Sequence, residues 1–406
     1  MRMRLSARWI LRACGPMGIA LLLAGFATST SPGAVLYVYP DGSGDYPDIQ
    51  SAIVAAENHD TIALMDGVFE GPGNRELHLY QKSLTFTSVS GSAESCVVSL
   101  DGRPFFHLLN TVETHVWSMT WRMARFSPME DAGIDFQFCN FDRCEGIVDG
   151  SGGMGFSFCS FVNASGPQTN GGDVELYFCN ISGATSTRAL FSGGRMQAIG
   201  SVFLENATSS LVNMHHIYVT ECRFLGNRGT DALLREDRQG GWMWCELSTF
   251  ARNEGTSILF SGSTASIVSC TFADNTGAGP ELAFVASDDL LQFSLQNSIL
   301  SFRDGGPAVT CEGTVAPESR CSDIFGNSGG DWNGCLAAWE GVNGNISADP
   351  LYCRVPGENA YLLRDDSPCL PGYCSLMGAW GQGCAAAGVA ESPAAGTPFL
   401  SCRPNP

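Results

Sequence analysis

A short repeat dominates the chain between Trp121 and Ile299. The fragments FQFCNF, FSFCSF and LYFCNI align so that one apolar residue recurs at intervals of about 20 to 27 residues. These apolar positions are 121, 141, 161, 181, 203, 224, 250, 272 and 299. A unit this short has room for two or three strands and tight turns but not for a pair of helices, so each unit must bury its apolar side against its neighbours. The sequence therefore predicts an all-β solenoid.

Cysteine occupies a fixed place in the repeat, two residues before the apolar position. The residues concerned are Cys139, Cys159, Cys179, Cys222 and Cys270, with Ser201 and Ser248 in the same place in two other units. Identical positions in successive coils of a solenoid lie about 4.8 Å apart, so these side chains should form a column. Free cysteine packs as a small apolar residue, and we expect the column to consist mostly of reduced thiols.

Asparagine marks a second fixed place, three residues after the apolar position. It occurs in four consecutive units, as Asn206, Asn227, Asn253 and Asn275. Asparagine tolerates left-handed backbone and hydrogen-bonds nearby main chain, and stacked asparagines can also bond one another. The pattern predicts a structural ladder rather than a ligand site.

The beginning of the mature chain predicts a cap for the solenoid. Residues 35–39 alternate like a first strand, and residues 47–57 place apolar side chains at helical spacing, with Asp48 available as a helix cap. A short amphipathic helix here would cover the open end of the coils, whose unpaired edges otherwise favour association.

Residues 1–34 are typical of a cleaved signal peptide. They contain four arginines, no acidic residue and an apolar run of about ten residues, roughly half of what a membrane-spanning helix needs. The sequence thus predicts a secreted, periplasmic or cell-surface protein with no membrane span after cleavage.

Removing the segment changes the formal charge from −19 to −19 − 4 = −23. Such a charge disfavours nucleic acid, and also acidic polysaccharide unless a basic patch or divalent cations compensate.

A cysteine-rich closing module is predicted after the coils. Of the 17 cysteines, Cys14 belongs to the signal peptide, and seven fall in residues 311–384. In an exported chain such a cluster indicates disulfides. The short, glycine-rich loops between them suggest the pairs Cys321–Cys335 and Cys374–Cys384. The resulting organisation is a β-solenoid over 35–310, the module over 311–384 and a flexible tail over 385–406.

These features resemble the right-handed parallel β-helix proteins of the pectate-lyase-like group. Asp41-Gly-Ser-Gly-Asp-Tyr46, Ile49-Gln50 and Asp66-Gly67-Val-Phe69 are similar to the opening of pectin methylesterases. The segment from Cys321 through Asp349-Pro-Leu351 to Cys369 resembles the closing module of exported bacterial β-helix proteins of unassigned role. The resemblance implies a right-handed parallel β-helix and a polysaccharide partner. The catalytic motifs of pectin methylesterases are not present, so no catalytic residue is carried over.

The only candidate for chemistry lies in the long unit of 26 residues. Its insertion carries Arg235, Glu236, Asp237 and Arg238, followed by Trp242 and Trp244. The resemblance implies that a polysaccharide lyase would use an arginine as base and Ca²⁺ to neutralise a uronate; otherwise no cofactor is expected. The alternative for this insertion is a solvated loop whose charges pair with one another. The histidines show no zinc-binding spacing, and His215 and His216 should point to opposite faces of a strand.

Three functions remain open from the sequence. The first is an exported, non-catalytic scaffold or glycan-binding solenoid. The second is a polysaccharide lyase or related carbohydrate-active enzyme, and the third is a surface adhesin. An outward face on which arginines and carboxylates gather across parallel strands would favour the enzyme, and a smoothly charged convex surface would favour the scaffold. The sequence does not determine the oligomeric state.

Overall fold

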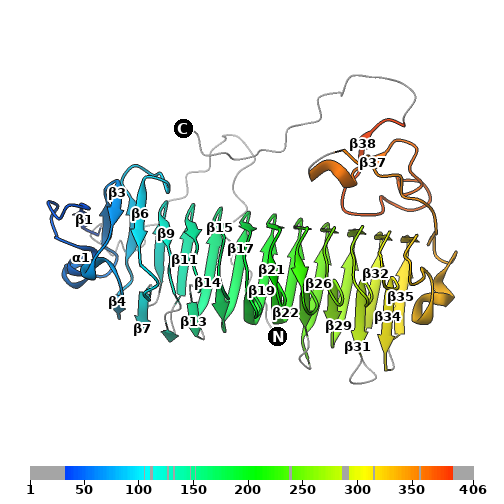
Figure 1. Ribbon diagram of the computed structural model, residues 1–406, viewed down its shortest axis with the longest axis horizontal. Coiled ribbons are helices and arrows are strands. Elements are labelled where there is room, and N and C mark those ends of the chain that lie inside the picture. The colour runs from blue at the N-terminus through cyan, green and yellow to red at the C-terminus, as the bar shows by residue number, and fades with distance from the viewer. Residues whose placement is uncertain are drawn as a thin grey trace, which may run out of the picture. The chain divides into compact units, whose positions relative to one another are not determined.

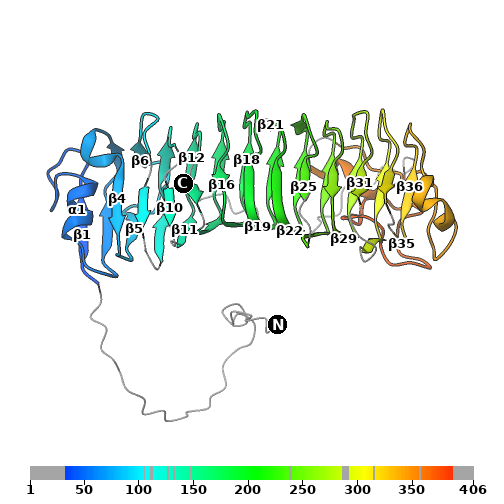
Figure 2. The same ribbon diagram turned by 90° about the horizontal axis from the view of Figure 1, so that it is seen from below.

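The computed structural model shows a parallel β-helix, an elongated stack of coils with one helix at its beginning (Figures 1 and 2). It describes residues 33–386 except 105, 110–112, 126–127, 131–132, 147, 151, 237–239, 286–291, 314–315 and 356–357. The expected signal peptide and nearly all of the expected tail lie outside these residues. In the part of the chain that is described, every helix is too short or too polar to traverse a bilayer.

Each coil contributes strands to three rows, which we call rows 1, 2 and 3 in chain order. Row 1 contains β4 (Leu77–Tyr80), β7 (Phe106–Leu109), β10 (Pro128–Glu130), β13 (Val148–Gly150), β16 (Thr169–Asn170), β25 (Leu234–Glu236), β28 (Leu259–Ser261), β31 (Leu282–Val285) and β34 (Val309–Glu312). Row 2 contains β1 (Val35–Val38), β2 (Thr61–Leu64), β5 (Thr85–Ser88), β8 (Thr114–Trp117), β11 (Gly133–Gln137), β14 (Gly153–Ser157), β17 (Asp173–Tyr177), β26 (Trp242–Glu246), β29 (Thr264–Val268), β32 (Gln292–Gln296) and β35 (Ala316–Arg320). Two long strands, β19 (Phe191–Ile199) and β22 (Val212–Thr220), run through rows 1 and 2.

Row 3 is a separate 12-stranded sheet. Its strands are β3 (Gly67–Phe69), β6 (Cys96–Ser99), β9 (Thr120–Arg122), β12 (Asn140–Asp142), β15 (Ser160–Val162), β18 (Asn180–Ser182), β20 (Val202–Leu204), β23 (Arg223–Leu225), β27 (Thr249–Ala251), β30 (Thr271–Ala273), β33 (Ile299–Ser301) and β36 (Asp323–Phe325). Two strand pairs complete the structure, β21 (Ala207–Thr208) with β24 (Arg228–Gly229) and β37 (Leu363–Arg364) with β38 (Gln382–Cys384). Because β34, β35 and β36 still pair in register, the coils continue to Phe325, beyond the boundary at residue 310 expected from the sequence.

The repeated apolar positions align in row 3 and form the core, as the sequence predicts. Trp121 pairs with Phe141, and the same register continues along the row. Phe203, Phe224, Phe250 and Phe272 stack with ring centroids 4.5 to 4.7 Å apart. The last position is the exception, because Phe272 pairs with Leu300 and not with the expected Ile299.

Two polar ladders run along the coils beside this core. Cys139, Cys159 and Cys179 are buried free thiols, and hydroxyl groups continue their column. The Cys179 N–H donates to Ser201 Oγ at 3.1 Å, and the Cys222 N–H donates to Ser248 Oγ at 3.1 Å. These bonds satisfy buried backbone donors that the turn would otherwise leave unpaired.

The asparagine ladder is fully buried. Asn206 donates to Asn227 Oδ1 at 2.9 Å, Asn227 to Asn253 Oδ1 at 3.0 Å, and Asn253 to Asn275 Oδ1 at 3.1 Å. Asn275 then donates to Glu281 Oε1 at 3.0 Å. The Oδ1 atoms of Asn227, Asn253 and Asn275 also accept the backbone N–H of the preceding asparagine, and Asn206 Oδ1 accepts the Ala184 N–H, so the four residues connect successive coils.

The helix α1 (Ile49–Ala55) covers the first coil, as expected. Asp48 caps it by accepting the Ser51 N–H at 2.7 Å, which satisfies one of the free donors of the first turn. Ile49, Ala52 and Ile53 are buried in the main core, so the helix closes the apolar interior at this end.

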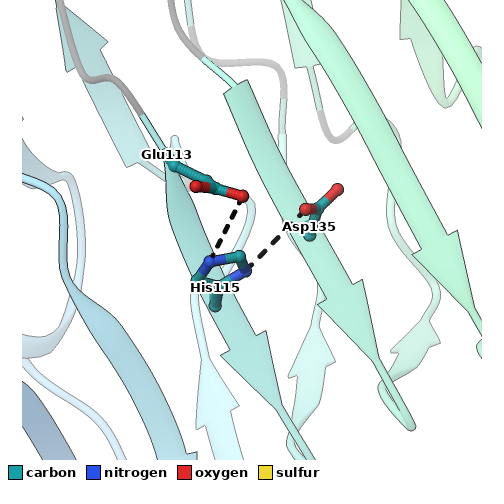
Figure 3. A group of neighbouring side chains, drawn as sticks. All are labelled: Glu113, His115 and Asp135. Atoms are coloured by element: carbon teal, nitrogen blue, oxygen red, sulfur yellow. Dashed lines mark ion pairs between the residues drawn. The ribbon is translucent and has the colours of Figure 1, made fainter. Parts of the chain in front are cut away.

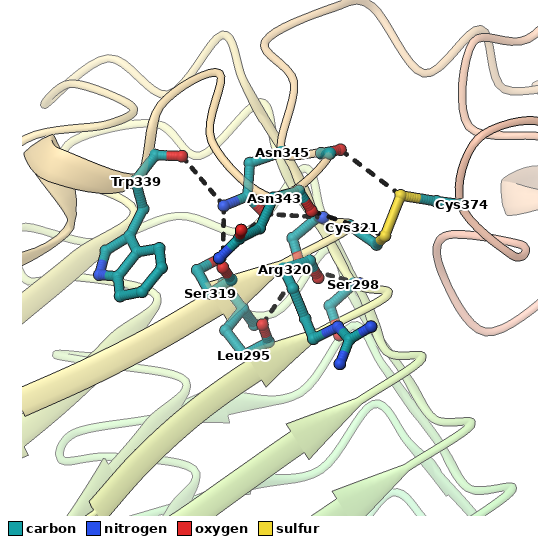
Figure 4. The surroundings of a disulfide bond; sticks show 11 residues. Leu295, Ser298, Ser319, Arg320, Cys321, Trp339, Asn343, Asn345 and Cys374 are labelled. Carbon is teal, nitrogen blue, oxygen red and sulfur yellow. Dashed lines mark hydrogen bonds between the residues drawn. A yellow bond between two sulfur atoms is a disulfide. The ribbon is translucent and has the colours of Figure 1, made fainter.

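The closing module is held by three disulfides, and their pairing differs from the expected one. The pairs are Cys311–Cys335, Cys321–Cys374 and Cys353–Cys384, not Cys321–Cys335 and Cys374–Cys384. Short 3₁₀-helices lie at Pro72–Asn74, Gly334–Trp339 and Glu358–Tyr361. The expected pairs were wrong because they joined cysteines across short loops. The chain instead folds back and brings Cys374 to the coil that carries Cys321 (Figure 4).

The folded-back module packs on the outward side of row 3. The Trp380 indole N–H donates to Thr249 Oγ1 at 2.7 Å, and the Ala379 N–H donates to Thr271 Oγ1 at 2.9 Å. Ile299 faces this module and belongs to a second apolar cluster with Tyr352 and Met377. The side chain that the repeat pattern misassigned is therefore buried on the opposite side of the sheet.

A buried carboxylate beneath the module makes stability depend on pH. Burial raises the pKa of Asp323 from its ordinary 3.8 to about 7, although the Ala348 N–H and the Cys369 thiol donate to it at 3.0 and 3.2 Å. The folded protein therefore binds this proton more tightly, so its contribution to the free energy of unfolding falls as pH rises from about 4 to 7. In urea denaturation at several pH values, we expect Asp323→Asn to show a flatter profile over this window. Parallel profiles for the two proteins would contradict the assignment.

Candidate functional site

Among the described residues of the 26-residue unit, Arg235 and Glu236 lie in β25 of row 1, and Trp242 and Trp244 lie in β26 of row 2. Glu236 in β25 is buried and accepts hydrogen bonds from Ser263 Oγ at 2.5 Å and Ser261 Oγ at 3.1 Å. Arg235 lies 3.1 Å from Asp231, with its guanidinium over the ring of Phe260 at 4.3 Å. Both side chains therefore take part in contacts within row 1, and Asp237 and Arg238 lie outside the described residues.

The two tryptophans of that unit belong to a different surface. Trp242 and Trp244 lie in β26, on the outward side of row 2. Trp244 is 40% exposed and donates to Glu246 at 3.3 Å, and Trp242 stacks on His216 of β22 with centroids 5.2 Å apart. Because β22 and β26 are neighbours in row 2, this outward surface continues across the coils.

We call this surface the row 2 face. Side chains alternate along each strand, so every second residue points outward, and the parallel register aligns these residues across the strands. One line across the face contains His115, Asp135, Gly155, Glu175, Gln197, Tyr218 and Trp244. A second line contains Trp117, Gln137, Ser157, Tyr177, Ile199, Thr220 and Glu246. The face thus combines aromatic, carboxylate, amide and hydroxyl groups.

Glu113, His115 and Asp135 form a compact group on this face (Figure 3). His115 Nε2 lies 3.6 Å from Glu113 Oε1, and His115 Nδ1 lies 3.8 Å from Asp135 Oδ2. Burial raises the pKa of Asp135; His115 opposes this shift, and Glu113 and Glu175 add to it. One ligand atom from each residue lies within 4.8 Å of the others, so the three residues could hold a metal ion.

A glycine makes room for this group in the next strand. A Cβ atom on Gly155 would lie only 2.2 Å from Asp135 Oδ1, so no other residue fits here without moving the carboxylate. On the far side of Gly155, the Tyr177 hydroxyl donates to Glu175 Oε2 at 3.2 Å. Burial and the Glu175 carboxylate raise the pKa of Tyr177 to about 12. The Asp135 carboxylate therefore occupies the space above Gly155, on the line of the face that leads to Glu175.

The face continues with a cation and an aromatic border. Arg195 pairs with Asp173 at 3.1 Å in the neighbouring strand. Phe138, Phe158 and Phe178 follow the last residues of β11, β14 and β17, and they are 53%, 43% and 53% exposed. Their rings stack with centroids 5.1 and 5.3 Å apart. An exposed apolar edge therefore runs beside the polar lines of the row 2 face.

A pocket of about 290 Å³ adjoins the group at its other side. Its lining is mainly polar and comprises Asn58, His59, Gln81, Ser83, Leu84, Thr85, Glu113 and His115. Since Glu113 and His115 belong to both, the pocket and the carboxylate–imidazole group form one continuous site.

The adjacent histidines differ from the expectation. His215 and His216 both lie at the partly exposed outer surface, with ring centroids 4.2 Å apart. In the register of β19 and β22, Gly193 pairs with Met214 and Arg195 with His216, so His215 sits where the strand turns from row 1 to row 2. The strict alternation of a straight strand fails at this corner. Burial and the neighbouring His215 lower the pKa of His216.

Sequence reasoning missed the group around His115 because its members look ordinary in isolation. The same 20-residue spacing that aligned the cysteines also places Asp135 over His115 and Phe158 over Phe138. Applying that spacing to every polar residue, rather than to the repeated motif alone, would have found the face.

No family model matches the sequence, and no curated protein matches it. Among solved structures, the chain is similar to the A-module of the mannuronan C-5 epimerase AlgE6 from Azotobacter vinelandii. The identity is 11%, the TM-score is 0.26, and the match covers 74% of this chain and 93% of the other. A likeness at this level does not bear on activity, and the fold rests on the strand register described above.

Proposed function

We propose that the protein is an exported solenoid that binds a polysaccharide along the row 2 face. The observation that carries the proposal is the alignment of exposed aromatic and hydrogen-bonding side chains across adjacent parallel strands. Sugar rings present apolar C–H surfaces and polar hydroxyl edges, and tryptophan and tyrosine combine an apolar ring with a polar group. An extended glycan lying across the coils would meet one set of these side chains in each coil.

The charges on the face favour an uncharged glycan. Glu113, Asp135, Asp173, Glu175 and Glu246 all contribute carboxylates, and Arg195 is already paired with Asp173. Like charges at short range repel, so a uronate polymer would bind here only with a compensating cation. Three disulfides support an exported location, because such bonds persist in oxidising compartments.

The binding test uses neutral polysaccharides such as xylan, mannan and β-glucan beside polygalacturonate and alginate, in affinity electrophoresis. We expect Trp117→Ala and Trp244→Ala each to weaken binding of a neutral polymer about tenfold, since exposed aromatic anchors dominate such contacts. Tyr373→Ala is the matched control, because Tyr373 is 91% exposed on the closing module. The proposal fails if no polymer binds, or if the two tryptophan variants bind like the control.

A carbohydrate-active enzyme is the second candidate, favoured by the two carboxylates Asp135 and Glu175 on one line of the face. The two residues lie two coils apart, so their Cα atoms are separated by about 10 Å, and paired carboxylates flanking a sugar are the usual machinery for cleaving glycosidic bonds. Release of reducing ends from a bound polymer, lost in Glu175→Gln, would favour the enzyme over a binding protein.

A further inference from the structure

We propose that Glu113, His115 and Asp135 bind a divalent transition-metal ion of the zinc type. His115 and Asp135 come from two adjacent strands of row 2, and Glu113 from the residue before the first of them. Glu113 directly precedes β8, His115 lies two residues later on the same side, and Asp135 is its register partner in β11. The backbone ladder therefore fixes the spacing of His115 and Asp135, and Glu113 adjoins it at the start of β8.

The distances suit an ion better than a direct hydrogen-bonded cluster. The separations of 3.6 Å from His115 Nε2 to Glu113 and of 3.8 Å from His115 Nδ1 to Asp135 exceed hydrogen-bonding distance. One ligand atom from each of the three residues lies within 4.8 Å of the others. Ligands bound at 2.0 to 2.2 Å from a zinc ion lie about 3.0 to 3.5 Å from one another. Small side-chain rotations would bring one nitrogen of His115 and an oxygen of each carboxylate to that spacing.

The surroundings leave the group short of positive charge. Two carboxylates flank one imidazole, and Glu175 adds a third acidic residue on the same line of the face. His115 Nδ1 is buried without a hydrogen-bond partner among the described residues. Arg195, the nearest arginine along the face, is paired with Asp173. A divalent cation would neutralise the repulsion between the carboxylates.

The ligand set selects the class of ion. Calcium and magnesium prefer oxygen ligands alone, whereas an imidazole with carboxylates suits zinc and its neighbours in the first transition row. Three protein ligands leave a fourth position free for water or a ligand oxygen. The adjoining pocket of about 290 Å³ gives access to that position. A glycan oxygen could occupy it; this role rests on the proposed function, whereas ion binding does not.

The test measures zinc binding by isothermal titration calorimetry. It uses the whole folded protein after treatment with a chelator, without any refolding step. We expect one Zn²⁺ per chain at this site, at least tenfold weaker binding for His115→Ala and Asp135→Asn, and much weaker binding of Ca²⁺ to the native protein. His78→Ala is the matched control, because it removes an exposed histidine that stacks on His107 in row 1. Glu113→Gln is the conservative variant in case either of the others fails to fold.

Thermal denaturation gives a second readout. Zn²⁺ should raise the midpoint of the native protein and of His78→Ala, since a ligand that binds only the folded state stabilises it, but not that of His115→Ala. The inference is overturned if Zn²⁺ does not bind, if the three site variants bind it like the native protein, or if Ca²⁺ binds equally well. Repeating the glycan assay with chelator distinguishes the two proposals. If the protein binds zinc but no glycan, only the proposed function is contradicted.

Discussion

Replacing Asn253 with leucine should lower the free energy of unfolding by about 3 to 6 kcal/mol, because several buried polar groups would each lose a partner at about 1 to 3 kcal/mol. Asn253 Oδ1 accepts the backbone and side-chain N–H groups of Asn227 at 2.9 and 3.0 Å. Its amide donates to Phe224 O at 2.9 Å and to Asn275 Oδ1 at 3.1 Å. Leucine has a similar volume, so the loss would come from unsatisfied hydrogen bonds and not from a cavity.

Urea denaturation followed by far-ultraviolet circular dichroism would measure this effect. Asn180→Leu is the matched control, because Asn180 is exposed on the outward side of β18, and its replacement should change stability by less than about 0.5 kcal/mol. Equal midpoints for the two variants would show that the ladder does not stabilise the coils.

Removing the disulfide Cys321–Cys374 with a double alanine substitution should destabilise the protein by about 4 kcal/mol, because the bond closes a loop of 53 residues. It also ties the closing module to the coil that carries Cys321. Without it we expect the module to detach first, which would expose Ala251, Ala273 and Ile299 on row 3.

Limited proteolysis and binding of a hydrophobic dye would report this detachment. The pair Cys311–Cys335 provides the comparison, because it joins β34 to Gly334–Trp339 across only 24 residues and lies outside the packed contact around Trp380. Its removal should leave residues 361–384 resistant to protease. If both double variants are cleaved alike, the Cys321–Cys374 bond does not specifically hold the module.

The architecture could be predicted because one physical constraint repeats along the chain. Stacked coils require like residues over like residues, so the row 3 core and both ladders were already visible in the spacing of phenylalanine, cysteine and asparagine. The alignment slipped by one residue at Ile299, where the interval from Phe272 is long and two apolar residues are adjacent. Leu300 fills the core while Ile299 faces the closing module. The repeat pattern within the coils contains no information about the closing module, which folds back onto row 3 from later in the chain.

The disulfides and the candidate site depended on such long-range information. Cys321 and Cys374 meet only because the module folds back over row 3. The insertion containing Arg235 attracted notice through its composition, yet Glu236 is buried beside serines of the next coil. Conversely, Glu113, His115 and Asp135 are unremarkable in a linear scan, and become a group only when the strand register is applied.

The equal length of three consecutive units has an evolutionary consequence. Trp121, Phe141, Phe161 and Ile181 pair in sequence at intervals of 20 residues, so deleting or duplicating one entire unit would join ends that already match. Such an event would shorten or extend the row 2 face by about 4.8 Å while preserving both flanks. The length of the row 2 face, and of any polymer that it could contact, can therefore change in steps of one coil.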